Sequence, residues 1–256
     1  MAAAYRWPVP LRIFAILMSW LGAGVALADP RVAVIIDDLG NLRGAGERTA
    51  ALNGPVAFAI LPHTPHAAYL AKLANASGKE VLLHLPLQPL ETISVGGIGN
   101  IELDLSRGQF ARIFGANLAS VPYVTGVNTH MGSLITQHPG HMSWLMRELN
   151  QRGDLFFVDS RTTAASVALQ MALEYGVPAT RRDVFLDDDP DPRAIAAQFD
   201  RLKNLARVHG SAVAIGHPRA GTLSFLERTL PRLVDEGIEL VPVRAIIRGQ
   251  QVLAAQ

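Results

Sequence analysis

The residues best suited to chemistry are aspartates and histidines that come directly after short apolar runs. Asp37 and Asp38 end the first of these runs. His84, His130 and His217 stand at or just beyond the ends of three others. Carboxylate oxygens and neutral imidazole nitrogens are ligands of Zn²⁺ and related divalent metals, and imidazole also titrates near neutrality. The pattern therefore indicates a metal site, with His217 as a candidate general acid or base.

Further polar residues follow the same kind of apolar run, and they are Asn128, Ser133, Asp159, Arg161 and Asp187. Side chains around a metal site commonly orient its ligands or bind the substrate. We expect each of these residues to orient a ligand or to bind the substrate. Asp159 suits helix capping equally well, because aspartate is a good N-cap.

The main candidates also have ordinary structural interpretations. Asp37 and Asp38 could cap a helix that begins near Asn41. Two adjacent carboxylates after a buried strand are costly unless a cation or hydrogen-bond donors compensate, which favours a functional role. His84 alone would be typical of a hydrogen-bonded core histidine. Its occurrence together with Asp38 and His130 favours a role as a metal ligand.

Short β-branched-rich runs alternate with amphipathic helical patterns along the chain. The runs that predict strands are Val32–Ile36, Val56–Leu61, Glu80–Leu85, Tyr123–Val127, Leu155–Val158, Asp183–Leu186, Ala212–Ile215 and Glu239–Val243. The patterns that predict helices are Leu42–Leu52, His66–Ala76, Arg107–Ser120, His141–Arg152, Ala164–Tyr175, Pro192–Val208 and Leu223–Glu236. This alternation predicts an α/β domain with mostly parallel strands, either a closed or nearly closed β/α barrel or, alternatively, a doubly wound open sheet. In a barrel, the strand-end residues above would converge on one face.

The two ends of the chain differ from this central domain. Residues 1–28 resemble a secretory signal, since Arg6 and Arg12 precede the apolar run Ile13–Val25 and a small-x-small motif closes the segment. An uncleaved membrane anchor is the alternative interpretation, although the run is short for a span of about 20 residues. We expect an exported, periplasmic protein with no stable membrane span after cleavage. Residues 29–247 form the predicted domain, and residues 248–256 are predicted to be a loose tail.

The composition excludes several kinds of function. The chain has 256 residues and no cysteine, which rules out disulfides, Cys-type zinc sites and thiol catalysis. The formal net charge of +1 becomes −1 without residues 1–28, which carry two arginines and no acids. Such a balance gives no support to nucleic-acid binding. It is compatible with an uncharged substrate.

Six segments, taken in order, resemble the divergent polysaccharide deacetylases, a branch of the NodB-like carbohydrate esterases. The segments are Ile35–Gly40 (IIDDLG), Leu83–Pro86 (LHLP), Gly126–Ser133 (GVNTHMGS), Asp159–Thr163 (DSRTT), Phe185–Asp187 (FLD) and Ile215–Pro218 (IGHP). The resemblance covers roughly residues 31–247. It implies a distorted, TIM-barrel-related β/α barrel that removes N- or O-acetyl groups from a glycan with a divalent metal, most often zinc.

The same resemblance assigns roles to the candidate residues. It implies that Asp37 is the catalytic base and that Asp38 is a metal ligand. The superfamily takes two histidine ligands from one closely spaced motif, which is absent here, so His84 and His130 are assigned from their strand positions. The late histidine that acts as the acid corresponds to His217. The chain departs from the family pattern at the rim of the site, at Gln88, Thr129 and Asp188.

Two alternatives remain open. The altered histidine arrangement is compatible with a catalytically inactive glycan-binding or envelope-assembly protein on the same scaffold. A metal-dependent hydrolase of another substrate, such as a peptide or a phosphoester, is also compatible with the residues, because one fold hosts many chemistries.

Overall fold

The structure is a computed structural model that describes Met1, residues 29–91 and residues 98–254. Its strands are β1 (Arg31–Leu39), β2 (Ala57–Ile60), β3 (Val81–Leu87), β4 (Val124–Met131), β5 (Phe156–Asp159), β6 (Ala179–Arg181), β7 (Val184–Phe185), β8 (Ser211–Gly216) and β9 (Glu239–Leu240). Its α-helices are α1 (Arg43–Ala50), α2 (Ala67–Ala76), α3 (Arg107–Ser120), α4 (Pro139–Gln151), α5 (Ala168–Glu174), α6 (Pro192–His209), α7 (Ala220–Thr229) and α8 (Val243–Ala254). None of the helices in the described part of the chain has the length and apolarity needed to cross a membrane.

Every predicted strand and helix overlaps an observed one, and the differences lie late in the chain. Strand β6 was not predicted, and the strand expected at Glu239–Val243 ends at Leu240. The loose tail predicted from residue 248 is wrong over residues 248–254, because these residues are the last turns of α8. The predicted leader falls almost wholly outside the described residues, as do residues 92–97 between β3 and α3.

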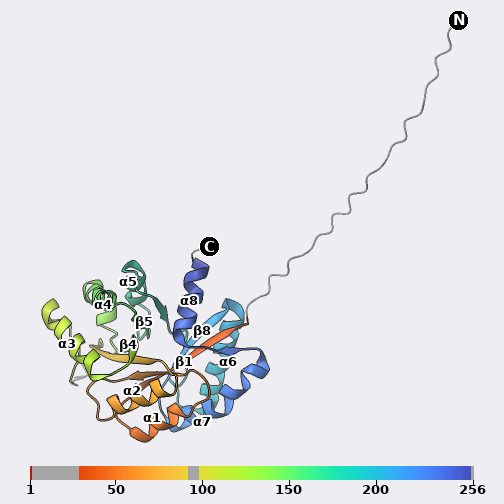
Figure 1. Ribbon diagram of the computed structural model, residues 1–256, viewed down its shortest axis with the longest axis horizontal. Helices are drawn as coiled ribbons and strands as arrows, with labels where there is room; N and C mark the ends of the chain where they lie inside the picture. Colours follow the sequence, from red (N-terminus) through yellow and green to blue (C-terminus); the bar gives the residue numbers. More distant parts are fainter. Residues whose placement is uncertain (2–28, 92–97, 255–256) are drawn as a thin grey trace.

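All strand pairings are parallel, and the strand order is β6-β5-β4-β3-β2-β1-β8-β7, with β9 beside the start of β1. The sheet curls, and helices lie around its outside, as Figure 1 shows. This is a distorted β/α barrel of mostly parallel strands, as the sequence predicted. Parallel strands place their carboxyl ends at one edge, so the residues that follow them meet there.

The two outermost strands of this order, β6 and β7, belong to one extended segment. It pairs first with β5, where Asp159 faces Arg181, and then with β8, where Val184 faces Ala214. Two side chains satisfy backbone groups at the change of partner. Arg182 donates to the carbonyls of Ser160 (2.6 Å) and Arg161 (2.7 Å). The Asp183 carboxylate accepts the Val213 N–H at 2.8 Å, so this irregular junction leaves these groups paired.

Apolar side chains pack on both faces of the curled sheet. The larger cluster lies between the sheet and the outer helices and includes Phe58, Phe110 and Phe157. The smaller cluster fills the barrel interior with alternate residues of the strands, which are Ala33, Ile35, Ala57, Ala59, Leu82, Phe156, Val158, Val213 and Ile215. Because side chains alternate along a strand, the next inward positions after these residues point to the same interior.

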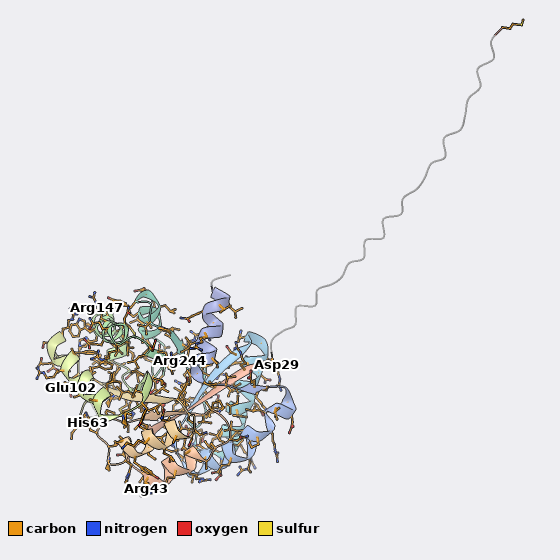
Figure 2. The ribbon with its side chains drawn as sticks, in the orientation of Figure 1. Asp29, Arg43, His63, Glu102, Arg147 and Arg244 are labelled. Atoms are coloured by element: carbon orange, nitrogen blue, oxygen red, sulfur yellow. The ribbon has the colours of Figure 1, made fainter. Side chains whose placement is uncertain are left out.

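Helix α8 covers the end of the barrel opposite the strands' carboxyl ends. Its Val243, Ile246 and Ile247 are buried in the interior cluster, and each buried aliphatic side chain contributes about 1.5–3 kcal/mol. The Glu80 carboxylate accepts the N–H groups of Val243 (2.7 Å) and Arg244 (3.1 Å), which caps the helix. Arg244, labelled in Figure 2, donates to the carbonyls of two neighbouring strand starts. These contacts explain why the C-terminal segment is ordered.

Candidate metal and acid–base site

Strand β1 brings two consecutive carboxylates to the interior. Asp37 follows Ala33 and Ile35 on the inward face, and it is 4% exposed. Alternation alone would turn Asp38 outward. The register between β1 and β2 shifts between Ile36 and Leu39, and Asp38 has a left-handed φ of 57°. Aspartate tolerates this conformation better than most residues. The irregularity turns both carboxylates toward the same site.

Two histidines from neighbouring strands meet Asp38. His84 lies on β3, two residues after the inward Leu82, and His130 lies near the end of β4. Asp38 Oδ1 lies 2.9 Å from His130 Nδ1 and 3.2 Å from His84 Nε2. The two imidazole nitrogens are 3.2 Å apart. The three predicted ligand atoms therefore form a compact triangle, contributed by β1, β3 and β4.

This triangle fits a metal ion. Asp38 Oδ1 is buried and accepts no hydrogen bond of normal geometry, so its lone pairs are available. Three atoms with these separations can all lie ~2.0–2.2 Å from one point, which is the range of zinc bonds to nitrogen and oxygen. Asp38, His84 and His130 are the residues that would hold such an ion. A mixed nitrogen and oxygen donor set suits zinc and other divalent transition metals.

Asn128 connects the ligand His84 to the second carboxylate. Its Nδ2 donates to Asp37 Oδ1 at 2.7 Å, which leaves its Oδ1 as the acceptor that faces His84 Nδ1 at 2.8 Å. In neutral His84 the proton must then lie on Nδ1, because an amide oxygen cannot donate. His84 Nε2 is thereby left with its lone pair toward Asp38 and His130. Outer hydrogen bonds of this kind fix the orientation of metal ligands.

The pKa values of the two carboxyl groups move in opposite directions. Burial raises the pKa of Asp37 and outweighs the nearby His84 and the Asn128 hydrogen bond. Burial also opposes ionisation of Asp38, but the adjacent His130 and His84 outweigh it and hold the pKa of Asp38 well below its usual range. Burial would lower the pKa of His84, yet the carboxylates of Asp37 and Asp38 raise it to about 9. Asp38 thus suits a permanent ligand, and Asp37 suits a proton acceptor.

A second acid–base pair, Asp187 and His217, faces this group from just beyond the ends of β7 and β8. The fully buried Asp187 accepts the His217 Nδ1–H (2.9 Å), the His217 N–H (2.9 Å) and the Thr222 hydroxyl (2.6 Å). His217 Nε2 then points toward Asp38 Oδ2, at 3.7 Å. Burial lowers the pKa of His217, but the contact with Asp187 outweighs it and raises the pKa overall. This pair can hold a proton on Nε2 at the edge of the site.

Three other predicted residues make local contacts instead. The Ser133 hydroxyl accepts the Leu90 N–H at 2.8 Å and so holds the loop after β3. The Asp159 carboxylate accepts the Arg161 N–H and the Ser166 hydroxyl, both at 2.9 Å. Asp159 therefore closes the loop after β5, in line with the capping alternative. Arg161 lines a cavity beside this loop.

Two residues at the site were not predicted. Thr222 lies on α7 and donates a hydrogen bond to Asp187. Arg182 lies near Asp37: burial lowers the pKa of Arg182, and the Asp37 carboxylate opposes this shift. Thr222 follows no strand, and Arg182 belongs to the unpredicted change of strand partner. Neither had a sequence signal by which it could be found.

Comparisons with known proteins show the family and the fold of this chain. A family model described as divergent polysaccharide deacetylase matches residues 34–247. An uncharacterized protein of Haemophilus influenzae is 34% identical over 240 residues, which is 94% of this chain and 85% of the relative. The uncharacterized protein YibQ of Escherichia coli is 35% identical over 232 residues, covering 89% of this chain and 72% of YibQ. The crystal structure of the uncharacterized protein ATU2773 from Agrobacterium tumefaciens superposes with a TM-score of 0.82 at 22% identity, over 89% of this chain and 91% of that one.

Proposed function

The chain belongs to the divergent polysaccharide deacetylase family, and on this premise we propose that it is a metal-dependent hydrolase that removes acetyl groups from a glycan. The observation that carries the proposal is the meeting of Asp38 Oδ1, His84 Nε2 and His130 Nδ1 within 3.2 Å of one another. A base and an acid lie beside this triangle: Asp37 Oδ2 is 3.7 Å from His84 Nε2, and His217 Nε2 is 3.7 Å from Asp38 Oδ2. Zinc is the proposed ion, because one oxygen and two nitrogen ligands with an open position are typical of catalytic zinc sites.

A bound divalent cation supplies Lewis acidity there, polarising both a water molecule and the acetyl carbonyl. Asp37 takes the proton from the attacking water. Its Oδ1 is occupied by Asn128, so Oδ2 is the oxygen that receives this proton. The raised pKa of Asp37 brings it closer to neutrality and makes it a better base than an ordinary aspartate.

His217 completes the reaction as the acid. When protonated, its Nε2–H donates to the leaving nitrogen or oxygen as the acetyl carbon releases it. Asp187 and Thr222 hold the ring so that Nδ1 is committed and Nε2 faces the site. The proton that Asp37 takes from the water and the proton that His217 gives to the leaving group balance the hydrolysis to acetic acid and an amine or alcohol. The acetic acid then releases its own proton to solvent as acetate.

The substrate class follows from the family and from charge. A chain whose net charge is −1 without residues 1–28 has no general attraction for a polyanion, which favours an uncharged acetylated glycan. Residues 1–28 act as an export leader, so the glycan belongs to the cell envelope or lies outside it. Mass spectrometry of the mature N-terminus tests the leader, since cleavage after Ala28 removes these residues.

The deciding experiment combines metal analysis of the purified protein with acetate release from acetylated chito-oligosaccharides. We expect one metal ion per chain and acetate release that a chelator abolishes and Zn²⁺ restores. Full metal content in an Asp38→Ala, His84→Ala double variant would refute the ligand set. Full metal content without acetate release from N- or O-acetylated glycans would refute the hydrolase and favour an inactive, glycan-binding protein.

A further inference from the structure

A cavity of about 600 Å³ lies where the strand partner changes, and none of the proposed metal ligands lines it. Before this change of partner, β6 pairs only with β5. Among the described residues, no strand ladder joins β6 to the first half of β8, which leaves a gap in the sheet there. Residues of α5 and α6 and of the last turns of α8 line this cavity. The cavity thus results from the same irregular segment that links the two edges of the sheet.

Arginines dominate the charge of this cavity. Its lining includes Arg161, Arg181, Arg182 and Arg201, together with His209, against the single carboxylate of Asp183. In residues 29–91 and 98–254, the side chains of Arg161, Arg181 and Arg201 form no ion pair. Arg43, Arg48 and Arg152, elsewhere on the surface, are each paired with a glutamate.

The one carboxylate does not neutralise the cluster. The Asp183 carboxylate is already bonded to the Val213 N–H, and burial raises its pKa even though Arg181, His209 and Arg161 lie near enough to lower it. Two arginines and His209 therefore lie around this one carboxylate. A pocket with this charge excess favours an anionic group that accepts charge-assisted hydrogen bonds from guanidinium groups.

The rest of the lining is apolar. Leu169 and Leu173 of α5, Leu205 of α6 and Leu253 of α8 border the cavity. Leu173 is 60% exposed and Leu253 is 67% exposed, so two large aliphatic side chains stand free at its edge. A free inorganic anion would leave these side chains in contact with water. An apolar chain attached to the anion would cover them.

We propose that this cavity binds an anionic amphiphile, a phosphate-bearing head group joined to an apolar chain, as in a phospholipid. The arginines bind the phosphate, and the leucines contact the chain. The volume falls within the usual range for small-molecule sites, about 300–1,000 Å³. The apolar N-terminal segment of this same chain does not fit, because its charged side chains are two arginines, which the cavity would repel.

Isothermal titration of the purified protein with dihexanoyl phosphatidylglycerol, below its micelle concentration, tests the proposal. We expect one lipid bound per chain, with zwitterionic dihexanoyl phosphatidylcholine binding more than tenfold more weakly. The Arg181→Ala, Arg201→Ala double variant should bind phosphatidylglycerol about 25-fold more weakly, since one arginine contributes about fivefold to anionic lipid binding. An Arg107→Ala, Arg193→Ala variant removes the same charge far from the cavity and should bind normally.

The apolar contribution is tested separately. The Leu173→Ser, Leu253→Ser double variant should bind the lipid at least tenfold more weakly but bind inorganic phosphate as the unchanged protein does. The substituted residues of both test variants, Leu173, Arg181, Arg201 and Leu253, are exposed. Unchanged circular dichroism and an unchanged melting temperature confirm that the variants fold. The proposal would be overturned if phosphatidylglycerol did not bind, or if both lipids bound equally well. It would also be overturned if the Arg107/Arg193 control lost as much lipid affinity as the Arg181/Arg201 variant, or if a soluble glutamate- and leucine-rich peptide bound more tightly than the lipid.

Discussion

Asp37 and Asp38 are neighbours in the chain, yet both carboxylates reach the same site because Asp38 adopts a φ of 57°. In a regular strand they would point to opposite faces of the sheet. The surroundings of the two carboxylates differ. Asp37 accepts a hydrogen bond from Asn128, whereas Asp38 Oδ1 faces two histidine nitrogens. The pair therefore divides into a base and a ligand, and matched substitutions should separate these roles.

We expect Asp37→Asn to retain its metal and to lose acetate release by about 10²–10⁴-fold, the usual contribution of a positioned base. Asp38→Asn should lose metal affinity by more than about 100-fold, because even outer residues of metal sites contribute 10–100-fold. Metal titrations and kcat/KM on both variants check this. Equal metal loss in the two variants would contradict the division of roles.

Removal of the Asn128 amide should weaken metal binding without touching a ligand. Asn128→Ala leaves His84 Nδ1 without its buried acceptor, so the ring is free to change tautomer and orientation. We expect metal affinity about 10–100-fold lower, as for other residues that orient ligands. Thr129→Val is the matched control, since the Thr129 hydroxyl is buried and makes no hydrogen bond with the described residues. Unchanged affinity in Asn128→Ala would count against this orienting role.

The Asp187–His217 contact predicts a shift in the pH profile. His217 must be protonated to act as an acid, and Asp187 outweighs burial to raise its pKa. Activity should persist below this raised pKa and fall as the pH rises through it. Asp187→Asn removes the charge, so the pKa falls and the alkaline limb of kcat/KM should move to lower pH. An alkaline limb that stays in place would exclude His217 as the group that titrates there.

Helix α8 should contribute to stability through its inward face alone. Ile246 is fully buried in the barrel interior, and Ile246→Ala should lower the free energy of unfolding by about 2–5 kcal/mol. Leu253 lies on the same helix but is 67% exposed, so Leu253→Ala should change it by less than about 0.5 kcal/mol. Urea unfolding of both variants measures the difference. Similar values would mean that α8 does not pack in the interior as described.

Much of the site was predictable because its residues obey the period of a parallel strand. Asp37, His84 and His217 each come two residues after an inward apolar residue, and each strand ends at the same edge of the sheet. The start of α6 is equally local, because Asp191 directly precedes Pro192 and its carboxylate accepts the Arg193 N–H at 2.7 Å. Interactions within a few residues are visible in the chain itself.

The amino-acid sequence by itself determined the alternation of strands and helices, the absence of thiol chemistry, and the set of aspartates and histidines that can meet at one edge. Only the tertiary structure decided that Asp38 turns inward, that Asn128 joins Asp37 to His84, and that Arg182 lies near the base. It also decided that residues 248–254 continue α8 beside a cationic cavity. The physical reason is distance along the chain, because these outcomes depend on contacts between strands and helices far apart in sequence, which local propensity does not encode.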